Sequence, residues 1–245
     1  VLLLITGVAS AVMPFAYHSV ISEVSREKHR LFYTAYLLTF AGLLGMVMTG
    51  DAVNAFVFME IASLSAYVLI GLGRNRRALY ASFQYLVLGT IGATFFLIGV
   101  GLLYMLTGTL NMVDLSERLS GQHDNRVLFA AFSFLVVGLS LKLALFPLHL
   151  WLPNSYAYAP SIVTVLLAAT GTKVAVYLLL RFGFTVLQVN QHHELLSIID
   201  LLLPLALIGM FAGSIVAIYQ TDIKRLLAYS SISQIGYILL GIALA

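Results

Sequence analysis

The hydrophobic residues of this chain lie in eight long blocks, separated by short segments rich in polar and charged residues. Most blocks are close to the ~20 residues that an α-helix needs to cross a bilayer core. Lipid offers the backbone no hydrogen-bond partner, so a spanning segment must be a helix or part of a closed barrel, and the alternating polarity of barrel strands is missing here. The pattern predicts an all-α membrane protein, a polytopic bundle of about eight transmembrane helices. The predicted spans are 1–20, 32–50, 53–72, 80–106, 127–146, 161–181, 196–219 and 226–245.

The connections between the blocks are too short to hold a soluble domain, so residues 1–245 are expected to form a single transmembrane domain. The longest, 108–126, carries Leu110, Val113, Leu115 and Leu119 among charged residues. This spacing suits a short helix lying at the membrane surface, and an ordinary loop is the alternative.

Composition excludes a soluble globular protein. Of the 245 residues, 61% are hydrophobic and 9% charged, with a mean hydropathy of +1.00, whereas soluble domains carry about 25% charged residues. The absence of cysteine excludes disulfides and thiol ligands, and a net charge of +3 gives no reason to expect nucleic-acid binding. The chain starts at Val1 and its last block reaches Ala245 without a polar flank, so we expect it to be part of a longer protein.

Lysine and arginine predict the orientation in the membrane. If the spans alternate in direction, eight basic residues fall on one side and three on the other. The side with eight is expected to be cytoplasmic. Its members are Arg26, Lys28, Arg30, Arg74, Arg76, Arg77, Lys224 and Arg225, and those opposite are Arg118, Arg126 and Arg181.

The charged residues inside the apolar spans include Glu60, Lys142 and Lys173. A charge at the centre of a span costs about 2.5–3.5 kcal/mol on insertion scales, so these side chains should face the bundle interior, water or one another. One interpretation is a set of buried ion pairs that fix helix registry. The other is a path along which a carboxylate and two amines exchange protons, since desolvation can switch lysine between charged and neutral forms.

Pro147 is expected to break the fifth helix within the membrane, because proline removes a backbone donor and clashes with the preceding turn. Pro153 follows in the same segment, PLHLWLP. Broken helices at membrane depth often line ion sites, although this segment could instead simply end a helix at the interface. Between the prolines, His149 could relay protons, as histidine has an unperturbed pKa of about 6.5, or be a hydrogen-bonded structural residue.

No motif for a soluble enzyme is present: the chain lacks GxSxG, HExxH, P-loop and dinucleotide fingerprints. His192, His193 and Glu194 adjoin in a predicted loop, where a solvated surface is favoured over a metal site. We therefore predict no cofactor, no metal and no catalytic residue. Four glycines in the fourth span, Gly89, Gly92, Gly99 and Gly101, indicate close helix packing.

Three separated segments resemble the antiporter-like membrane subunits shared by respiratory complex I, membrane-bound hydrogenases and Mrp-type cation/proton antiporters. They are TGDAVNAFVFMEIASLSAYVLIG, LKLALFPLHLWLPNSYAYAPSIVTVLLAATGTKVAVYLLLR and TDIKRLLAYSSISQIGYILLG. The resemblance covers essentially the whole chain. It implies an inverted-repeat fold, with the first five-helix repeat at roughly residues 32–181 plus flanking helices.

The resemblance also implies roles. Glu60 matches a glutamate that pairs with a lysine on a broken helix, Lys142 matches that lysine, and Lys173 matches a lysine that connects onward, with His149 in the loop between. Met59 before Glu60 and Asn154 after Pro153 are more similar to the D-type membrane protein of Mrp antiporters, or to a hydrogenase-type relative, than to complex I members.

The resulting hypothesis is translocation of protons or of monovalent cations such as Na⁺ or K⁺, through a buried relay of Glu60, Lys142 and Lys173. The chain would act as an antiporter-like subunit of a multisubunit complex in a bacterial or archaeal cytoplasmic membrane. Its partners would be other membrane subunits and the lipid bilayer. The first alternative is a proton-pumping subunit of a complex I-type NADH:quinone oxidoreductase or a membrane-bound hydrogenase. The second is a structural scaffold without its own ion path, and a membrane enzyme is the least favoured.

Overall fold

The computed structural model describes residues 1–120, 126–191 and 193–244. These residues form helices and turns, with a single isolated β-bridge between Asp51 and Asn111. The elements are α1 Leu2–Glu23, η1 Arg26–Lys28, α2 His29–Met48, α3 Ala52–Gly71, α4 Arg76–Thr107, α5 Met112–Leu119, α6 Arg126–Leu143, α7 Trp151–Tyr158, α8 Ser161–Leu166, η2 Leu167–Gly171, α9 Thr172–Leu180, η3 Arg181–Val186, η4 Val189–Gln191, α10 His193–Ile218 and α11 Ile223–Ala243.

Eight helical segments in the described part of the chain are long and apolar enough to cross a membrane. This confirms the predicted all-α bundle of eight spans. The sixth span, Ser161–Val186, is one continuous helical segment built from α8, η2, α9 and η3. Two parts of it, η2 and η3, are wound as π-helix.

The connection after α4 contains a short helix, α5, which was one of the two alternatives expected for residues 108–126. Asn111 caps α5 by accepting hydrogen bonds from the backbone N–H groups of Val113 and Asp114. Met112, Leu115 and Leu119 form its buried face. Residues 121–125 and His192 lie outside the described residues, so the expectation of a solvated loop at His192–Glu194 stays untested.

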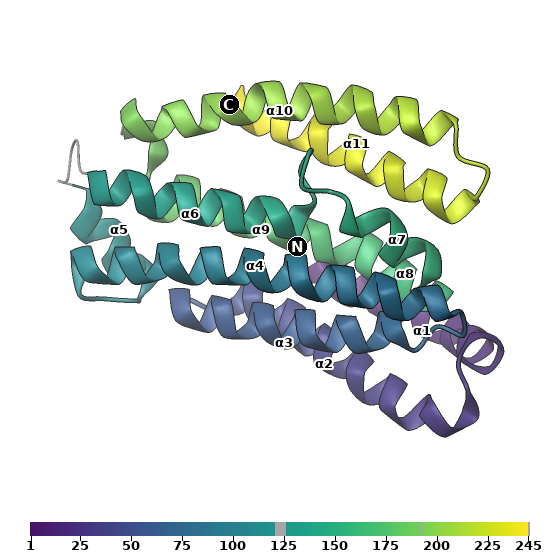
Figure 1. Cartoon of the computed structure of the whole chain (residues 1–245). Coiled ribbons are helices and arrows are strands. Elements are labelled where there is room, and N and C mark those ends of the chain that lie inside the picture. The colour runs from purple at the N-terminus through teal and green to yellow at the C-terminus, as the bar shows by residue number, and fades with distance from the viewer. Residues whose placement is uncertain (121–125, 192, 245) are drawn as a thin grey trace.

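The helices run roughly along a common direction (Figure 1). In that view α4 and α6 lie side by side, with α2 and α3 beyond one side of them and the α10–α11 hairpin beyond the other. Helices α4 and α6 approach closely, because a Cβ atom at Gly138 would lie 2.6 Å from the carbonyl oxygen of Gly92. The expectation of close packing fails at Gly101, where a Cβ atom would meet nothing within 4 Å.

The basic residues gather at the two ends of the bundle in the groups that the sequence predicts. At one end Arg77 and Arg225 both donate hydrogen bonds to the hydroxyl of Tyr158. At the other, Arg118 donates to the carbonyl of Thr107 and Arg181 to that of Val47. The broken segment between α6 and α7 therefore leads toward the end that is richer in positive charge.

Candidate functional site: a lysine at the end of a broken helix

Helix α6 ends at Leu143, and a left-handed cap follows at Ala144, two residues after Lys142. Ala144 has φ +59°, its N–H donates to the carbonyl of Leu141, and the N–H of Leu145 reaches back to that of Ser140. This is the Schellman arrangement that closes many helices, here with alanine where glycine is usual. It places Lys142 in the last turn of α6, at the negative end of the helix dipole.

The predicted break near Pro147 is confirmed, although the proline itself does not end the helix. Helix α6 stops at Leu143, four residues before Pro147, because the cap at Ala144 has already reversed the chain. Pro147 lies in the non-helical segment 144–150, after a cis peptide bond. Pro153 lies in the first turn of α7, where a missing N–H costs no intrahelical bond.

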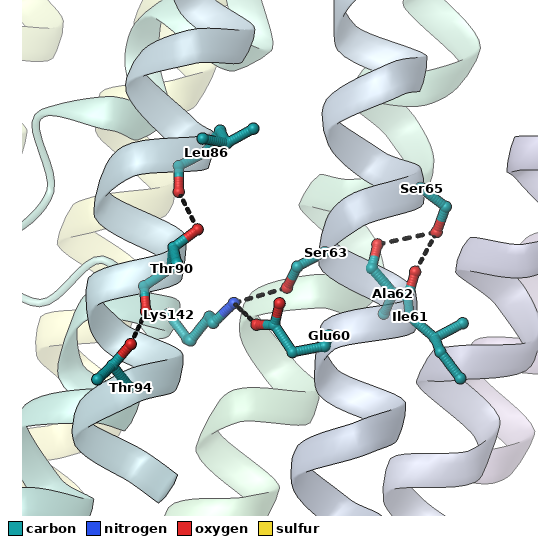
Figure 2. Close-up of polar contacts among 9 residues, drawn as sticks. All are labelled: Glu60, Ile61, Ala62, Ser63, Ser65, Leu86, Thr90, Thr94 and Lys142. Carbon is teal, nitrogen blue, oxygen red and sulfur yellow. Dashed lines mark hydrogen bonds and ion pairs between the residues drawn. The ribbon is translucent and has the colours of Figure 1, made fainter. Parts of the chain in front are cut away.

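The ammonium group of Lys142 lies between two groups of α3. Its Nζ donates a 2.6 Å hydrogen bond to Oγ of Ser63 and lies 3.9 Å from Oε1 of Glu60. Figure 2 shows the three side chains pointing toward one another across the gap between the helices. The side chain of Lys142 is 6% exposed and that of Glu60 23%, so the lysine is the more deeply buried partner.

The carboxylate is poorly satisfied in this arrangement. Its Oε1 atom is buried and has no hydrogen-bond partner in the described part of the chain. A buried acceptor without a donor is costly, and a pair at 3.9 Å is in electrostatic contact without a hydrogen bond. Lys142 is thus closer to the hydroxyl than to its counter-charge.

Aromatic residues hold the broken segment against the neighbouring helices. The indole Nε1 of Trp151, at the start of α7, donates a 3.0 Å hydrogen bond to the carbonyl of Leu141. Its ring stacks on Tyr85 of α4 at a centroid distance of 4.2 Å, and Tyr85 meets Tyr67 of α3 edge-on at 4.7 Å. The half-helix α7 is therefore fixed to the turn of α6 that carries Lys142.

A cavity of about 40 Å³ opens beside Lys142. Its polar lining includes Ser63, Lys142 and Thr172, among apolar residues of α2, α3 and α9. The hydroxyl of Thr172 is buried without a hydrogen-bond partner among the described residues. Buried polar atoms are usually satisfied by protein or water, and a water needs about 10–15 Å³ of such volume.

Lys173 follows Thr172 and is held in a different way. Its Nζ donates a 2.6 Å hydrogen bond to the carbonyl of Ala168, which belongs to the π-helical turn η2. Within the described residues no carboxylate lies within ion-pair distance of it. Single π-turns occur frequently at functional sites, and this one supplies the lysine with a neutral acceptor.

His149 is not brought into contact with either lysine among the described residues. Its ring stacks on Phe146 and meets Tyr229 of α11 edge-on, and its Nδ1 is buried without a partner in that part of the chain. The ring thus packs the broken segment against α11. The roles of Glu60, Lys142, Lys173 and His149 in proton movement stay predictions.

Sequence reasoning missed three polar residues of the site: Ser63, Thr172 and the indole of Trp151. A signal for Ser63 was available, since it lies three residues after Glu60 and thus on the same face of a helix. Thr172 and Trp151 could not be placed, because their positions depend on how η2 and α7 pack against other helices.

Comparison with known proteins identifies the family. The sequence profile of the family described as "NADH:quinone oxidoreductase/Mrp antiporter, TM" matches residues 49–245. The chain belongs to this family. The NADH-quinone oxidoreductase N subunit of Desulforudis audaxviator is 48% identical over 212 residues, covering 86% of this chain and 42% of that protein. The Na⁺/H⁺ antiporter D-type protein of Alkalihalophilus pseudofirmus is 37% identical over 230 residues, covering 94% and 45%.

A solved structure of this family shares the fold. A chain of the membrane-bound sulfane sulfur reductase, an archaeal respiratory membrane complex, superposes with a TM-score of 0.88 at 35% identity, covering 98% of this chain and 48% of that one. The present chain is therefore an integral membrane protein that spans less than half the length of these relatives. Relatives of both the oxidoreductase and the antiporter kind match it.

Proposed function

We propose that this chain is part of a subunit that moves protons across the membrane, with exchange for Na⁺ or K⁺, within a complex of several membrane subunits. The observation that carries the proposal is the placement of Lys142. It ends a broken helix, lies between a carboxylate and a hydroxyl, and lines a small internal cavity. The family relationship supports the same function.

The proposed step is a movement of the Lys142 ammonium between Glu60 and the cavity. At about 4 Å, opposite charges attract by about 4 kcal/mol when the effective dielectric constant is near 20. Close to the carboxylate, Lys142 therefore holds its proton. When the side chain turns toward Ser63 and the cavity, it loses part of this attraction while staying desolvated, which favours release of the proton.

The released proton would pass through water in the cavity toward Lys173. A volume of about 40 Å³ has room for at least one water, whose share of liquid volume is about 30 Å³. The hydroxyls of Ser63 and Thr172 can each donate and accept a hydrogen bond. Lys173 is the next residue along α9 from Thr172, and its link to the carbonyl of Ala168 leaves two of its three N–H donors unassigned.

A second candidate is proton pumping driven by electron transfer in partner subunits. The 48% identity to the N subunit of an NADH-quinone oxidoreductase favours it. The residues of this chain would act identically in both cases, and only the source of free energy would differ.

The test uses the full-length protein in its complex, in sealed vesicles with a pH-sensitive dye inside. For an antiporter we expect an imposed Na⁺ or K⁺ gradient to move protons without any redox substrate. For a redox-driven pump we expect proton movement only when an electron donor and acceptor are supplied. Proton movement under neither condition would contradict both candidates.

A further inference from the structure

A basic pocket lies at the end of the bundle toward which α6 and α7 lead, and the proposed proton step does not use it. The pocket has a volume of about 420 Å³. Three of its six lining residues are arginines from two helices that are distant in sequence. The lining residues are Arg76, Arg77, Tyr80, Asn154, Tyr158 and Arg225.

Two of these arginines converge on one tyrosine. Nη2 of Arg225 donates to the hydroxyl of Tyr158 at 2.8 Å and to Oδ1 of Asn154 at 3.1 Å, and Nη1 of Arg77 donates to the same hydroxyl at 3.3 Å. Both guanidinium groups also lie over the tyrosine ring, at 5.4 Å and 5.9 Å from its centroid. Two like charges are thus held close together by a neutral side chain.

The positive charge of the pocket is not balanced by the described residues. None of its three arginines has a carboxylate within ion-pair distance there. Arg76 and Arg77 begin α4, and Arg225 lies in the first turn of α11. The first turn of each of these two helices has no acidic residue. Basic side chains at the positive end of a helix dipole are unfavourable. An anion between the arginines would offset both their mutual repulsion and their repulsion by the helix dipoles.

Two arginines of the pocket lower the pKa of Tyr158. The hydrogen bond from Arg77 is the largest influence on its phenol and lowers its pKa, and the charge of Arg225 acts in the same direction, while burial opposes both. The carboxylate nearest in sequence to Arg225, that of Asp222, accepts a hydrogen bond from the backbone N–H of Lys224 as the N-cap of α11.

The position of the pocket fits a lipid headgroup. Helix α4 has 32 residues and is therefore about 48 Å long, which exceeds the ~30 Å hydrocarbon core, so its first turns reach headgroup level. Tyr80 at the pocket is 60% exposed, and Phe83 and Leu227, further along α4 and α11, are 62% and 59% exposed. These apolar side chains could run beside acyl chains.

We propose that this pocket binds the phosphate of an anionic phospholipid between α4, α7 and α11. The three arginines would contact the phosphate oxygens, and the acyl chains would lie along Tyr80 and Leu227. Basic pockets between transmembrane helices on the cytoplasmic side suit such headgroups. The bound lipid would also connect α7, the helix after the break, to α4 and α11.

The test is lipid binding by the full-length protein in neutral detergent, followed by native mass spectrometry. We expect phosphatidylglycerol to be retained more strongly than phosphatidylcholine. Arg77→Gln should weaken phosphatidylglycerol binding about fivefold, because one basic residue near anionic lipid contributes about 1 kcal/mol. Arg77→Lys should keep most of the binding. Arg74→Gln is the matched control, since Arg74 donates to the carbonyl of Ile21 and does not line the pocket.

Three outcomes would overturn the proposal. Equal retention of the two lipids, or unchanged phosphatidylglycerol binding in Arg77→Gln, would show that the pocket is not a lipid site. Inorganic phosphate that displaces phosphatidylglycerol at equal concentration would assign the pocket to a soluble anion. Loss of a partner subunit from the Arg77→Gln complex with unchanged lipid retention would assign it to an acidic protein surface.

Discussion

The two lysines within the spans of this chain are accommodated in different ways. Lys142 ends a capped helix and lies between the hydroxyl of Ser63 and the carboxylate of Glu60. Lys173 lies within a continuous helical span and donates to a backbone carbonyl of a π-turn. One ammonium is stabilised by side chains of another helix, and the other by its own helix. A charge in an apolar span therefore needs no counter-charge if the backbone supplies an acceptor.

Because their partners differ, the two lysines are expected to have different roles in proton transfer. The interaction of Lys142 with Glu60 changes when two helices move relative to each other, so its affinity for a proton can be controlled. Lys173 keeps its partner through such a movement, because Ala168 lies five residues away on the same helical segment. We therefore propose that Lys142 carries the controlled step and Lys173 the receiving step.

The largest effect is expected from Lys142→Met. Transport should fall to background, because no group remains to exchange the proton. Stability should fall as well, because Glu60 loses its only ion-pair partner among the described residues. Orphaning a fully buried charge costs about 3–5 kcal/mol, and the loss here should be smaller because Glu60 is partly exposed. Dye-based transport in vesicles and thermal unfolding of the full-length protein measure the two effects. Lys28→Met in the exposed η1 is the control, and equal behaviour of the two variants would contradict the assignment.

Substitutions of Lys173 test whether the two lysines act in different ways. Lys173→Met and Lys173→Arg should both lose transport, since guanidinium stays protonated and cannot pass a proton on. Unlike Lys142→Met, Lys173→Met should leave stability close to that of the wild type, because its partner is a neutral carbonyl and no charge is orphaned. Transport retained in Lys173→Arg but lost in Lys173→Met would instead indicate a structural lysine.

Ser63→Ala tests whether the hydroxyl holds Lys142 away from Glu60. A hydrogen bond to a charged group contributes about 1.5–3 kcal/mol, so transport should slow by about tenfold or more. Ser65→Ala is the matched control on α3, because its hydroxyl donates to its own helix and accepts from Thr39. The proposed role of Ser63 would be abandoned if both variants slowed transport equally.

The smallest effect is expected from Thr172→Val, which keeps the shape of the side chain and removes its hydroxyl from the cavity. A neutral hydrogen bond is worth about 0.5–1.5 kcal/mol, which corresponds to a rate that is about two- to tenfold slower. Thr170→Val serves as control, since that hydroxyl donates to the carbonyl of Leu166 within the helix. Rates that are equal in the two variants would argue against water-mediated transfer through this cavity.

The sequence predicts the parts of this structure that depend on local composition. Apolar block length locates the eight spans, and the high cost of charge in lipid explains why Glu60 and Lys142 meet. It does not predict the cap at Ala144, because alanine rarely adopts a left-handed conformation. Nor does it predict the π-turn at η2. No residue pattern marks such a turn, and packing between helices decides where it forms.

Glu60→Gln tests the central claim most directly, because it removes the charge that controls Lys142 and keeps the shape of the side chain. Transport by the full-length protein in sealed vesicles should be measured together with the amount of assembled complex. We expect transport to fall to background and stability to fall, because Lys142 loses its counter-charge, while the protein still inserts and assembles. Undiminished transport by a Glu60→Gln protein that is less stable or poorly assembled would show that the pair only fixes helix registry.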